Sequence, residues 1–248
     1  IERITNDNRG EQPARTPERT ALIERLRGRA GSEAAALNEV ESKEALRAYG
    51  IATPQEVLVA SRDDALAAAA RIGYPVVLKA VSKTLTHKSD AGAVALNLAT
   101  PEALGAAYDR MSGALSGHTL DGMLVGQFVT GGLELVLGLH HDREMGLVVM
   151  AGSGGVLLEL MKDVAFCAPP VSCAKAIDLI DRTQAGRLIR GYRGSAPRDG
   201  EAVVNALIGL GQLAIDLADV IESVDINPFV ALPQGGMALD ALIVLQRR

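Results

Sequence analysis

The stretch Pro75-Val-Val-Leu-Lys79-Ala-Val-Ser-Lys-Thr-Leu-Thr-His87-Lys-Ser-Asp90-Ala-Gly92-Ala-Val94 carries most of the information in this chain. An apolar, strand-like run ends in Lys79, and a polar loop that contains His87 follows it. The small residues of such a loop let backbone N–H groups approach an anion closely. The pattern is typical of a polyphosphate site, and the imidazole of His87 can accept and pass on a phosphoryl group.

Structural alternatives stay open for both residues. Lys79 fits a solvated lysine at a strand end equally well, and a single histidine in a polar loop is often an ordinary surface residue. Lys88 and Asp90 favour a functional interpretation of His87, because they would stabilise an anionic phosphate and orient the ring.

The composition limits the class of protein. The chain has 248 residues, of which 48% are hydrophobic, and this suits a globular protein of one domain or two closely associated subdomains. Its net charge of −5, its 3% of aromatic residues and its lack of tryptophan argue against a nucleic-acid partner. The apolar runs fall far short of the roughly 18 residues that span a membrane, so we expect no membrane segment. The two cysteines lack zinc-like spacing, and we expect a reducing, cytoplasmic location.

The order of sequence patterns predicts an α+β fold with α/β elements. Residues 1–33 are polar and read as a linker or N-terminal extension with a short helix at 21–29. We predict two subdomains after it, 34–120 and 121–248, which enclose a cleft. Predicted helices are 38–49, 63–72, 101–115, 173–181, 183–190 and 202–218. Predicted strands are 56–60, 75–81, 93–98, 122–129, 133–139, 145–151, 156–160, 164–168, 221–230 and 236–245.

A group of oxygen-bearing side chains near the C-terminus predicts a metal site. Asp225 and Asn227 point to one face if 221–230 is a strand, and the next strand brings Asp240. Such oxygens suit Mg²⁺, which also takes ligands from substrate phosphates. An Asp/Asn network within the hairpin is the structural alternative. Glu134 begins another apolar strand and could bind ligand hydroxyls such as a ribose, or be a surface glutamate.

Taken together, these residues resemble a known family. Leu-Lys79-Ala, Thr-His87-Lys-Ser-Asp-Ala-Gly, Gly-Leu-Glu134-Leu, Lys162-Asp-Val-Ala-Phe, Tyr192-Arg-Gly and Asp225-Ile-Asn-Pro look like the ATP-grasp portion of ADP (NDP)-forming acyl-CoA synthetases. These enzymes, also called ADP-forming acetate–CoA ligases, are related to the succinyl-CoA synthetase β subunit. The resemblance covers roughly residues 37–245 and differs at Ala93, Gly126 and Leu242, where the family often has glycine, Gln or Glu, and a basic residue.

The resemblance implies an ATP-grasp fold and the reversible reaction of acyl-CoA, ADP and phosphate to carboxylate, CoA and ATP. It implies a CoA-binding partner domain or subunit of α type, whose phosphohistidine delivers the phosphoryl group and which binds CoA and the carboxylic acid. ATP or ADP and Mg²⁺ are the implied cofactors.

Roles for individual residues follow from the same resemblance. His87 would relay the phosphoryl group, Asp225 would stabilise the phosphohistidine, and Asn227 and Asp240 would hold Mg²⁺. Val129 would meet adenine through its backbone and Glu134 would meet the ribose. The positions that match nucleotide-binding residues are Lys79, Lys88, Ser89, Val129 and Glu134.

Two other functions remain open at this point. One is an ATP-grasp carboxylate ligase that works alone through an acyl phosphate, although we identify no acyl-acceptor pocket for it. The other is a non-catalytic module that senses nucleotide for an attached domain. The carboxylic acid, the preference for ATP or GTP, and the arrangement as a separate subunit or part of a fused chain are not evident from the sequence.

Overall fold

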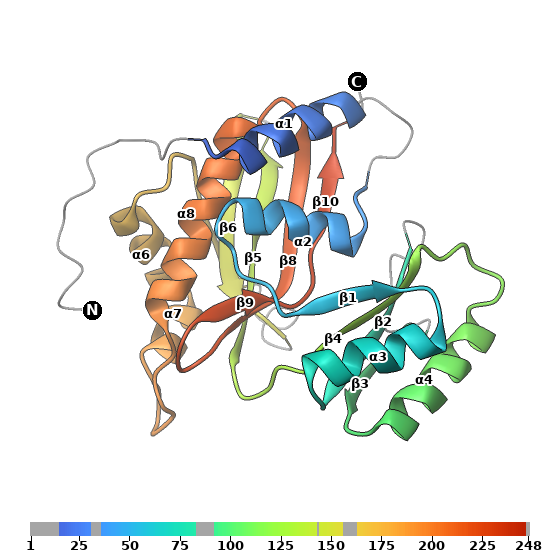
Figure 1. Ribbon diagram of the computed structural model, residues 1–248. Helices are drawn as coiled ribbons and strands as arrows, with labels where there is room; N and C mark the ends of the chain where they lie inside the picture. Colours follow the sequence, from blue (N-terminus) through green and yellow to red (C-terminus); the bar gives the residue numbers. More distant parts are fainter. Residues whose placement is uncertain (1–14, 31–35, 83–91, 143, 156–162, 247–248) are drawn as a thin grey trace.

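The computed structural model describes residues 15–30, 36–82, 92–142, 144–155 and 163–246 as two lobes (Figure 1). Each lobe has one antiparallel sheet and its own hydrophobic core. The smaller sheet has the strand order β1-β4-β2-β3, and the larger has β10-β8-β5-β6-β7 with β9 paired to β8. The helices are α1 (Pro17–Arg29), α2 (Glu39–Ala48), α3 (Arg62–Ile72), α4 (Pro101–Ala114), α6 (Cys173–Asp181), α7 (Gln184–Ile189) and α8 (Gly200–Asp216). The strands are β1 (Glu56–Val59), β2 (Val76–Val81), β3 (Val94–Leu98), β4 (Gly122–Gln127), β5 (Leu133–Asp142), β6 (Gly146–Ser153), β7 (Val164–Cys167), β8 (Ile221–Ala231), β9 (Gly236–Ala238) and β10 (Leu242–Leu245).

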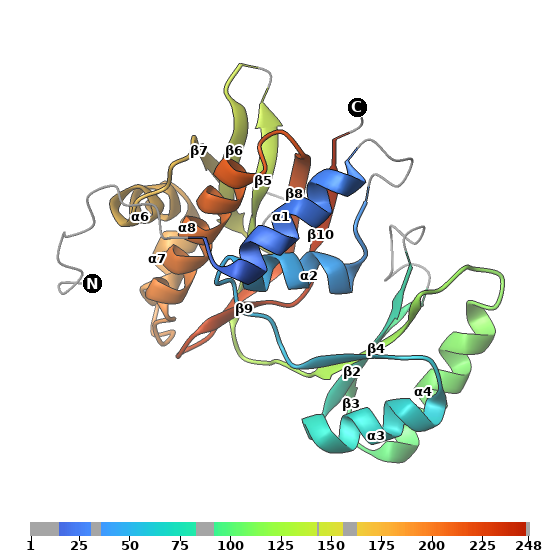
Figure 2. The same ribbon diagram turned by 45° about the horizontal axis from the view of Figure 1, so that its top comes forward.

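The alternation of side chains along β2 sets the orientation of the smaller sheet. Val76, Leu78 and Ala80 belong to the core of this lobe, which α3 and α4 cover. Lys79 lies between them in the sequence, so its side chain leaves the opposite face of the sheet. Figure 2 shows α3 and α4 on the side of the smaller sheet away from the larger lobe. The face with Lys79 therefore turns toward the larger lobe.

Helices cover one face of the larger sheet. Helix α8 packs against β5, β6 and β8, and its apolar residues belong to this core (Figure 1). Gly209 lets α8 pack closely against the C-terminal end of α2, because a Cβ atom at this position would lie 2.4 Å from the carbonyl oxygen of Tyr49. Leu135 and Leu137 of β5 point into the same core, so the residues between them point to the opposite face.

The structure departs from the predicted subdomain division at β4 and α2, and from the predicted strands at 236–245. Strand β4, which we assigned to the C-terminal subdomain, lies in the middle of the smaller sheet, and α2, which we assigned to the N-terminal subdomain, contributes to the larger core. The predicted strand 236–245 is wrong as one element, because it divides into β9 and β10. Both pair with β8, and the gap lies beside Pro228, which has no N–H for a sheet hydrogen bond. The predicted strand 156–160 lies outside the described residues.

Helix α1 is longer than the sequence predicted and belongs to the larger lobe. It starts at Pro17, capped by Thr16, and contributes Leu22, Ile23 and Leu26 to the core. Asp216, at the end of α8, is buried and holds this helix in place. Its carboxylate accepts a hydrogen bond of 2.6 Å from Nε of the buried Arg19. The segment 15–30 is therefore packed structure, unlike the linker that its composition predicts.

We expect Asp216→Asn to destabilise the protein, because it leaves the buried guanidinium of Arg19 without its anionic partner. The expected loss is about 3 kcal/mol in the free energy of unfolding, as for other broken buried pairs. Chemical denaturation followed by circular dichroism measures it.

Asp219→Asn is the matched control, since Asp219 pairs with Arg27 of the same helix at 3.2 Å but both side chains are about half exposed. An exposed pair contributes roughly 0–1 kcal/mol. Equal losses in the two variants would contradict the docking role of Asp216.

Candidate active site

Lys79 is buried where the two lobes meet. Its Nζ donates a hydrogen bond of 2.7 Å to Oε1 of Glu39 in α2 and another of 2.7 Å to the carbonyl oxygen of Leu239, between β9 and β10. The residue is only 8% exposed, so the interpretation of Lys79 as a solvated lysine at a strand end is wrong. A single ammonium group of the smaller lobe thus contacts two elements of the larger lobe.

Glu39 is the centre of a buried chain of charges. Lys43, one helical turn further along α2, donates to Glu39 at 2.9 Å and to the two carboxylate oxygens of Glu56 at 2.7 and 2.9 Å. The order of contacts is Glu56, Lys43, Glu39 and Lys79, and all four side chains are at most 10% exposed. We refer to these four residues as the charge chain.

Neighbouring carboxylates keep the ammonium of Lys79 protonated. Burial lowers the pKa of Lys79, but the nearby carboxylates of Glu39, Asp240 and Glu56 outweigh this effect and place it above the ordinary value. Burial also raises the pKa of Glu56, in spite of the opposing effect of Lys43. Lys79 therefore presents a fixed positive charge at neutral pH.

Asp225, Asn227 and Asp240 come together on the larger sheet, on the side away from its helices. Asp225 and Asn227 alternate with the buried residues Val224 and Ile226 along β8, as the sequence predicted. Leu242 of β10 pairs with Asp225, so Asp240, two residues earlier, falls beside Asn227. The gap between β9 and β10 is what places Asp240 there.

The charges of this group fit a divalent cation. Burial raises the pKa of the Asp225 carboxyl above its ordinary value, and the nearby Asp240 carboxylate raises it further. A cation between these side chains would relieve that repulsion, and carboxylate and amide oxygens are ligands that Mg²⁺ prefers. Within the described ranges, no three His, Cys, Asp or Glu side chains form a metal-binding group. The oxygens of Asn227, Asp240 and their neighbour Asp225 would suit an ion such as Mg²⁺, which also takes ligands from phosphate and water.

Lys79 and the acidic group are neighbours in space. The carbonyl of Leu239 that accepts from Lys79 directly precedes Asp240, and Asp240 contributes to the raised pKa of Lys79. The structure thus brings together Lys79 and Asp240, which are 161 positions apart in the sequence, with Asp225 and Asn227 on the adjacent strand.

Val129 lies within the connection from β4 to β5, which links the two sheets, and Glu134 follows it in β5. Val129 is half-buried, and Glu134 is exposed at the start of β5. Gly154 donates a backbone hydrogen bond of 3.0 Å to the carbonyl of Glu134, and a Cβ atom at Gly155 would lie 3.2 Å from Oε2 of Glu134. Their predicted contacts with adenine and ribose remain predictions. His87, Lys88 and Ser89 lie outside the described residues.

Our sequence analysis missed three members of the charge chain: Glu39, Lys43 and Glu56. A signal for two of them was present in the helix. Glu39, Lys43 and the core residue Leu46 are spaced four and three residues apart, so they share one stripe of α2. Charges on the buried stripe of an amphipathic helix indicate a buried polar network.

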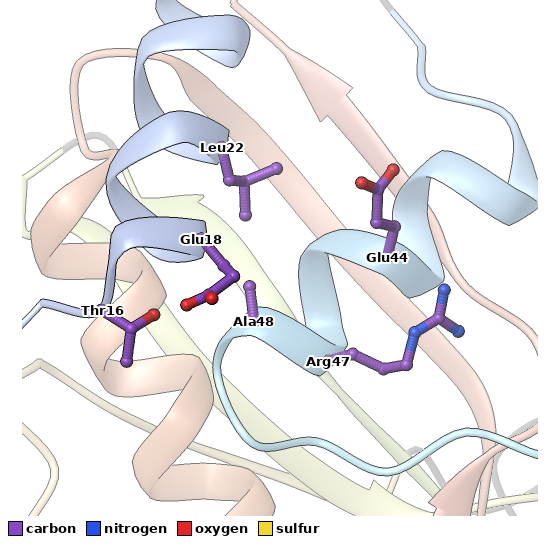
Figure 3. A pocket seen from close by; sticks show the side chains of 6 residues that line it. All are labelled: Thr16, Glu18, Leu22, Glu44, Arg47 and Ala48. Atoms are coloured by element: carbon purple, nitrogen blue, oxygen red, sulfur yellow. The ribbon is translucent and has the colours of Figure 1, made fainter.

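A cavity of about 450 Å³ lies elsewhere, between α1 and α2 (Figure 3). Its polar side chains, from Thr16, Glu18, Glu44 and Arg47, are exposed. None of its lining residues belongs to the charge chain or to the acidic group, so we do not assign the nucleotide to it.

Comparison with known proteins identifies the family. The ATP-grasp domain family matches residues 29–245. The chain belongs to the ATP-grasp family. This confirms the predicted ATP-grasp fold, and the relatives described next confirm the resemblance to ADP-forming CoA ligases.

Its relatives include subunits of ADP-forming ligases. The chain is 35% identical over 217 residues to the β subunit of "Acetate--CoA ligase [ADP-forming] II" of Pyrococcus furiosus, with 85% of this chain and 92% of that subunit covered. It is similar in structure to the dinucleotide-forming acetyl-CoA synthetase 1 of Candidatus Korarchaeum cryptofilum. The complex of that enzyme with coenzyme A and Ca-AMPCP has 35% identity and a TM-score of 0.84, and 93% of this chain and all of that chain are covered. A complex with Mg-AMPPCP, whose phosphohistidine segment points towards the nucleotide binding site, has 36% identity, coverage of 92% and 100%, and a TM-score of 0.78.

Among the described helices, none combines the length and the apolar character that crossing a membrane requires.

We expect Asp240→Asn to lower the pKa of Asp225 in the metal-free protein, because it removes a neighbouring negative charge. Burial is the larger cause of the raised value, so the pKa of Asp225 should stay above its ordinary value. A carboxyl ¹³C NMR titration measures the change. Glu222→Gln, at an exposed position of the same strand, should leave the titration unaltered, and an equal pKa in wild type and Asp240→Asn would refute the proximity of the two carboxylates.

Proposed function

We propose that this chain is the nucleotide-binding, phosphoryl-transferring component of an ADP-forming acyl-CoA synthetase. The overall reaction is acyl-CoA, ADP and phosphate to carboxylate, CoA and ATP, and it is reversible. The observation that carries the proposal is the contact of Lys79 with Leu239, which puts a fixed cation next to the acidic group of Asp225, Asn227 and Asp240. A cation beside oxygen ligands for a metal is the arrangement that a nucleotide polyphosphate requires.

Each residue of the site has a separate task in this proposal. Lys79 offsets negative charge on the nucleotide phosphates, and we assign Lys88 and Ser89 to the same phosphate groups. Val129 contacts adenine through its backbone, and the exposed carboxylate of Glu134 accepts hydrogen bonds from the ribose. Asn227 and Asp240 hold Mg²⁺, which when bound neutralises phosphate charge and orients the phosphoryl group.

His87 is the covalent carrier. A ring nitrogen of His87 attacks phosphorus, and its P–N bond forms as the P–N bond to the partner's phosphohistidine breaks. The terminal phosphate oxygen of ADP then attacks the same phosphorus, so an O–P bond forms and the P–N bond to His87 breaks. Asp225 stabilises the positively charged phosphohistidine ring through its carboxylate. One long transfer is thereby divided into two short ones.

The reaction requires a second protein part. A CoA-binding domain or subunit of α type would form the acyl phosphate, take its phosphoryl group on a histidine and present that histidine to this chain. CoA and the carboxylic acid would bind to this partner. The resemblance to separate β subunits favours such an arrangement.

Incubation with [γ-³²P]ATP and Mg²⁺ should label the protein on His87, because the transfer is reversible. The label should be acid-labile and base-stable, as expected of a phosphohistidine, and it should be absent from His87→Ala. Calorimetry should show that this variant still binds ADP, since the nucleotide contacts of Lys79 and Glu134 remain.

His118→Ala, at an exposed position, is the control and should keep the label. A label that persists in His87→Ala would place the carrier elsewhere. Nucleotide binding without any label in the wild type would favour a ligase that works through an acyl phosphate, or a nucleotide sensor.

Asp240→Asn should weaken the contribution of Mg²⁺ to ATP binding, because an amide oxygen is a weaker ligand than a carboxylate. We expect the Mg²⁺ concentration for half-maximal enhancement of ATP affinity to rise about tenfold, equivalent to the loss of one charged contact. Calorimetric titrations at several Mg²⁺ concentrations measure it, with Glu222→Gln as the control. An unchanged Mg²⁺ dependence would remove Asp240 from the metal site.

A further inference from the structure

Stability alone is a weak explanation for the charge chain. Ion pairs as deeply buried as Glu39 with Lys43 and Lys79 cost desolvation energy, and well-packed apolar residues in their place are often as stable or more stable. What an ion pair adds over apolar packing is direction, since each hydrogen bond fixes a donor atom relative to an acceptor. One atom of the charge chain is therefore expected to need a fixed position.

Lys79 is the member of the charge chain that reaches the proposed nucleotide site. An ammonium group has three N–H donors. Glu39 and the carbonyl of Leu239 take two of them, from two different elements of the larger lobe. These bonds fix the position of Nζ and leave one donor for an anion such as a phosphate oxygen.

Glu39 is in turn held by its other neighbour. Oε1 of Glu39 accepts from both Lys43 and Lys79, so the position of this oxygen depends on both ammonium groups. Lys43 is anchored at its far side by the bidentate contact with Glu56 of β1. The chain thus runs from β1 through α2 to β2.

Gly126 gives Glu56 the room for this contact. Glu56 and Gly126 are paired residues of β1 and β4. A Cβ atom at position 126 would lie 2.9 Å from Cγ of Glu56 and 3.3 Å from Cγ2 of Val77, closer than side chains normally pack. Glycine at position 126 therefore leaves the space in which Glu56 contacts Lys43 of the charge chain.

We propose that Glu39 is a positioning residue for Lys79 and that Lys43 and Glu56 hold Glu39 in place. The charge chain thereby sets the affinity of the site for the phosphate groups of the nucleotide. The inference rests on the proposed function, in which Lys79 contacts those phosphates. It predicts a loss of affinity that is specific to phosphate, because no member of the chain is assigned to adenine or ribose.

The test compares the binding of ADP with that of adenosine, both without Mg²⁺ and in the presence of EDTA. Three variants separate the steps of the argument. Lys79→Met removes the cation itself. The double variant Glu39→Gln/Lys43→Met removes one negative and one positive charge, so Lys79 loses its carboxylate while the net charge of the chain is unchanged. Lys43→Met/Glu56→Gln removes the support of Glu39 but leaves its contact with Lys79.

We expect Lys79→Met to bind ADP about tenfold more weakly than wild type, and Glu39→Gln/Lys43→Met about fivefold more weakly, as for the loss of a charged hydrogen bond and of its alignment. Lys43→Met/Glu56→Gln should show a smaller loss in the same direction. Adenosine affinity, measured by ligand-observed NMR, should stay at the wild-type value in all three. Glu44→Gln, which changes an exposed glutamate of the same helix, is the matched control and should bind both ligands like wild type.

Three results would overturn the inference. Normal ADP binding by Glu39→Gln/Lys43→Met, together with weak binding by Lys79→Met, would mean that Lys79 needs no positioning partner. An equal loss of ADP and adenosine affinity in the double variants would mean that the chain only maintains the fold. Normal ADP binding by Lys79→Met would refute the phosphate role of Lys79, and with it the part of the proposed function on which the inference rests.

Discussion

The contact between the ammonium of Lys79 and the carboxylate of Glu39 is the constraint on which the rest of the structure depends. It joins β2 of the smaller lobe to α2 of the larger lobe, and the adjacent bond to Leu239 joins the same ammonium to the connection between β9 and β10. A buried charge without a partner costs several kcal/mol. The lobes therefore meet where this pair is intact, and that position is next to the acidic group.

Apolar packing stabilises each lobe, and polar contacts align the two lobes with each other. Each lobe has its own hydrophobic core, and these cores stabilise the two sheets independently of each other. Hydrophobic burial is not directional, so it does not by itself align one lobe with the other. The charge chain supplies this alignment through hydrogen bonds between named atoms, and it uses the same lysine that the proposed function assigns to the nucleotide. The side chain that joins the two lobes is thus the one that we propose to bind phosphate.

The predictions succeeded where a local pattern was sufficient. Strand alternation placed Asp225 and Asn227 on one face, and the apolar run before Lys79 identified a buried strand. They failed where a distant residue decided the outcome. The strand predicted at 236–245 is divided because Pro228, on the neighbouring strand, cannot donate a hydrogen bond. The segment 15–30 looks like a linker in composition, yet Asp216, almost 200 residues later, binds Arg19 and holds α1 on the core.

The sequence by itself determined the alternation of helices and strands, the family motifs, and the residue types that a nucleotide and a metal ion require. These features depend on periodicity and on spacing along the polypeptide, and both can be read directly from the order of the amino acids. Only the tertiary structure decided which charges meet. Glu39 and Lys43 share one stripe of α2 with the core residue Leu46, but this spacing does not name their partners, and Glu56 and Lys79 look like two unrelated strand residues. Their association depends on how α2, β1 and β2 pack together, because a buried charge takes its partner from whichever element folding brings beside it.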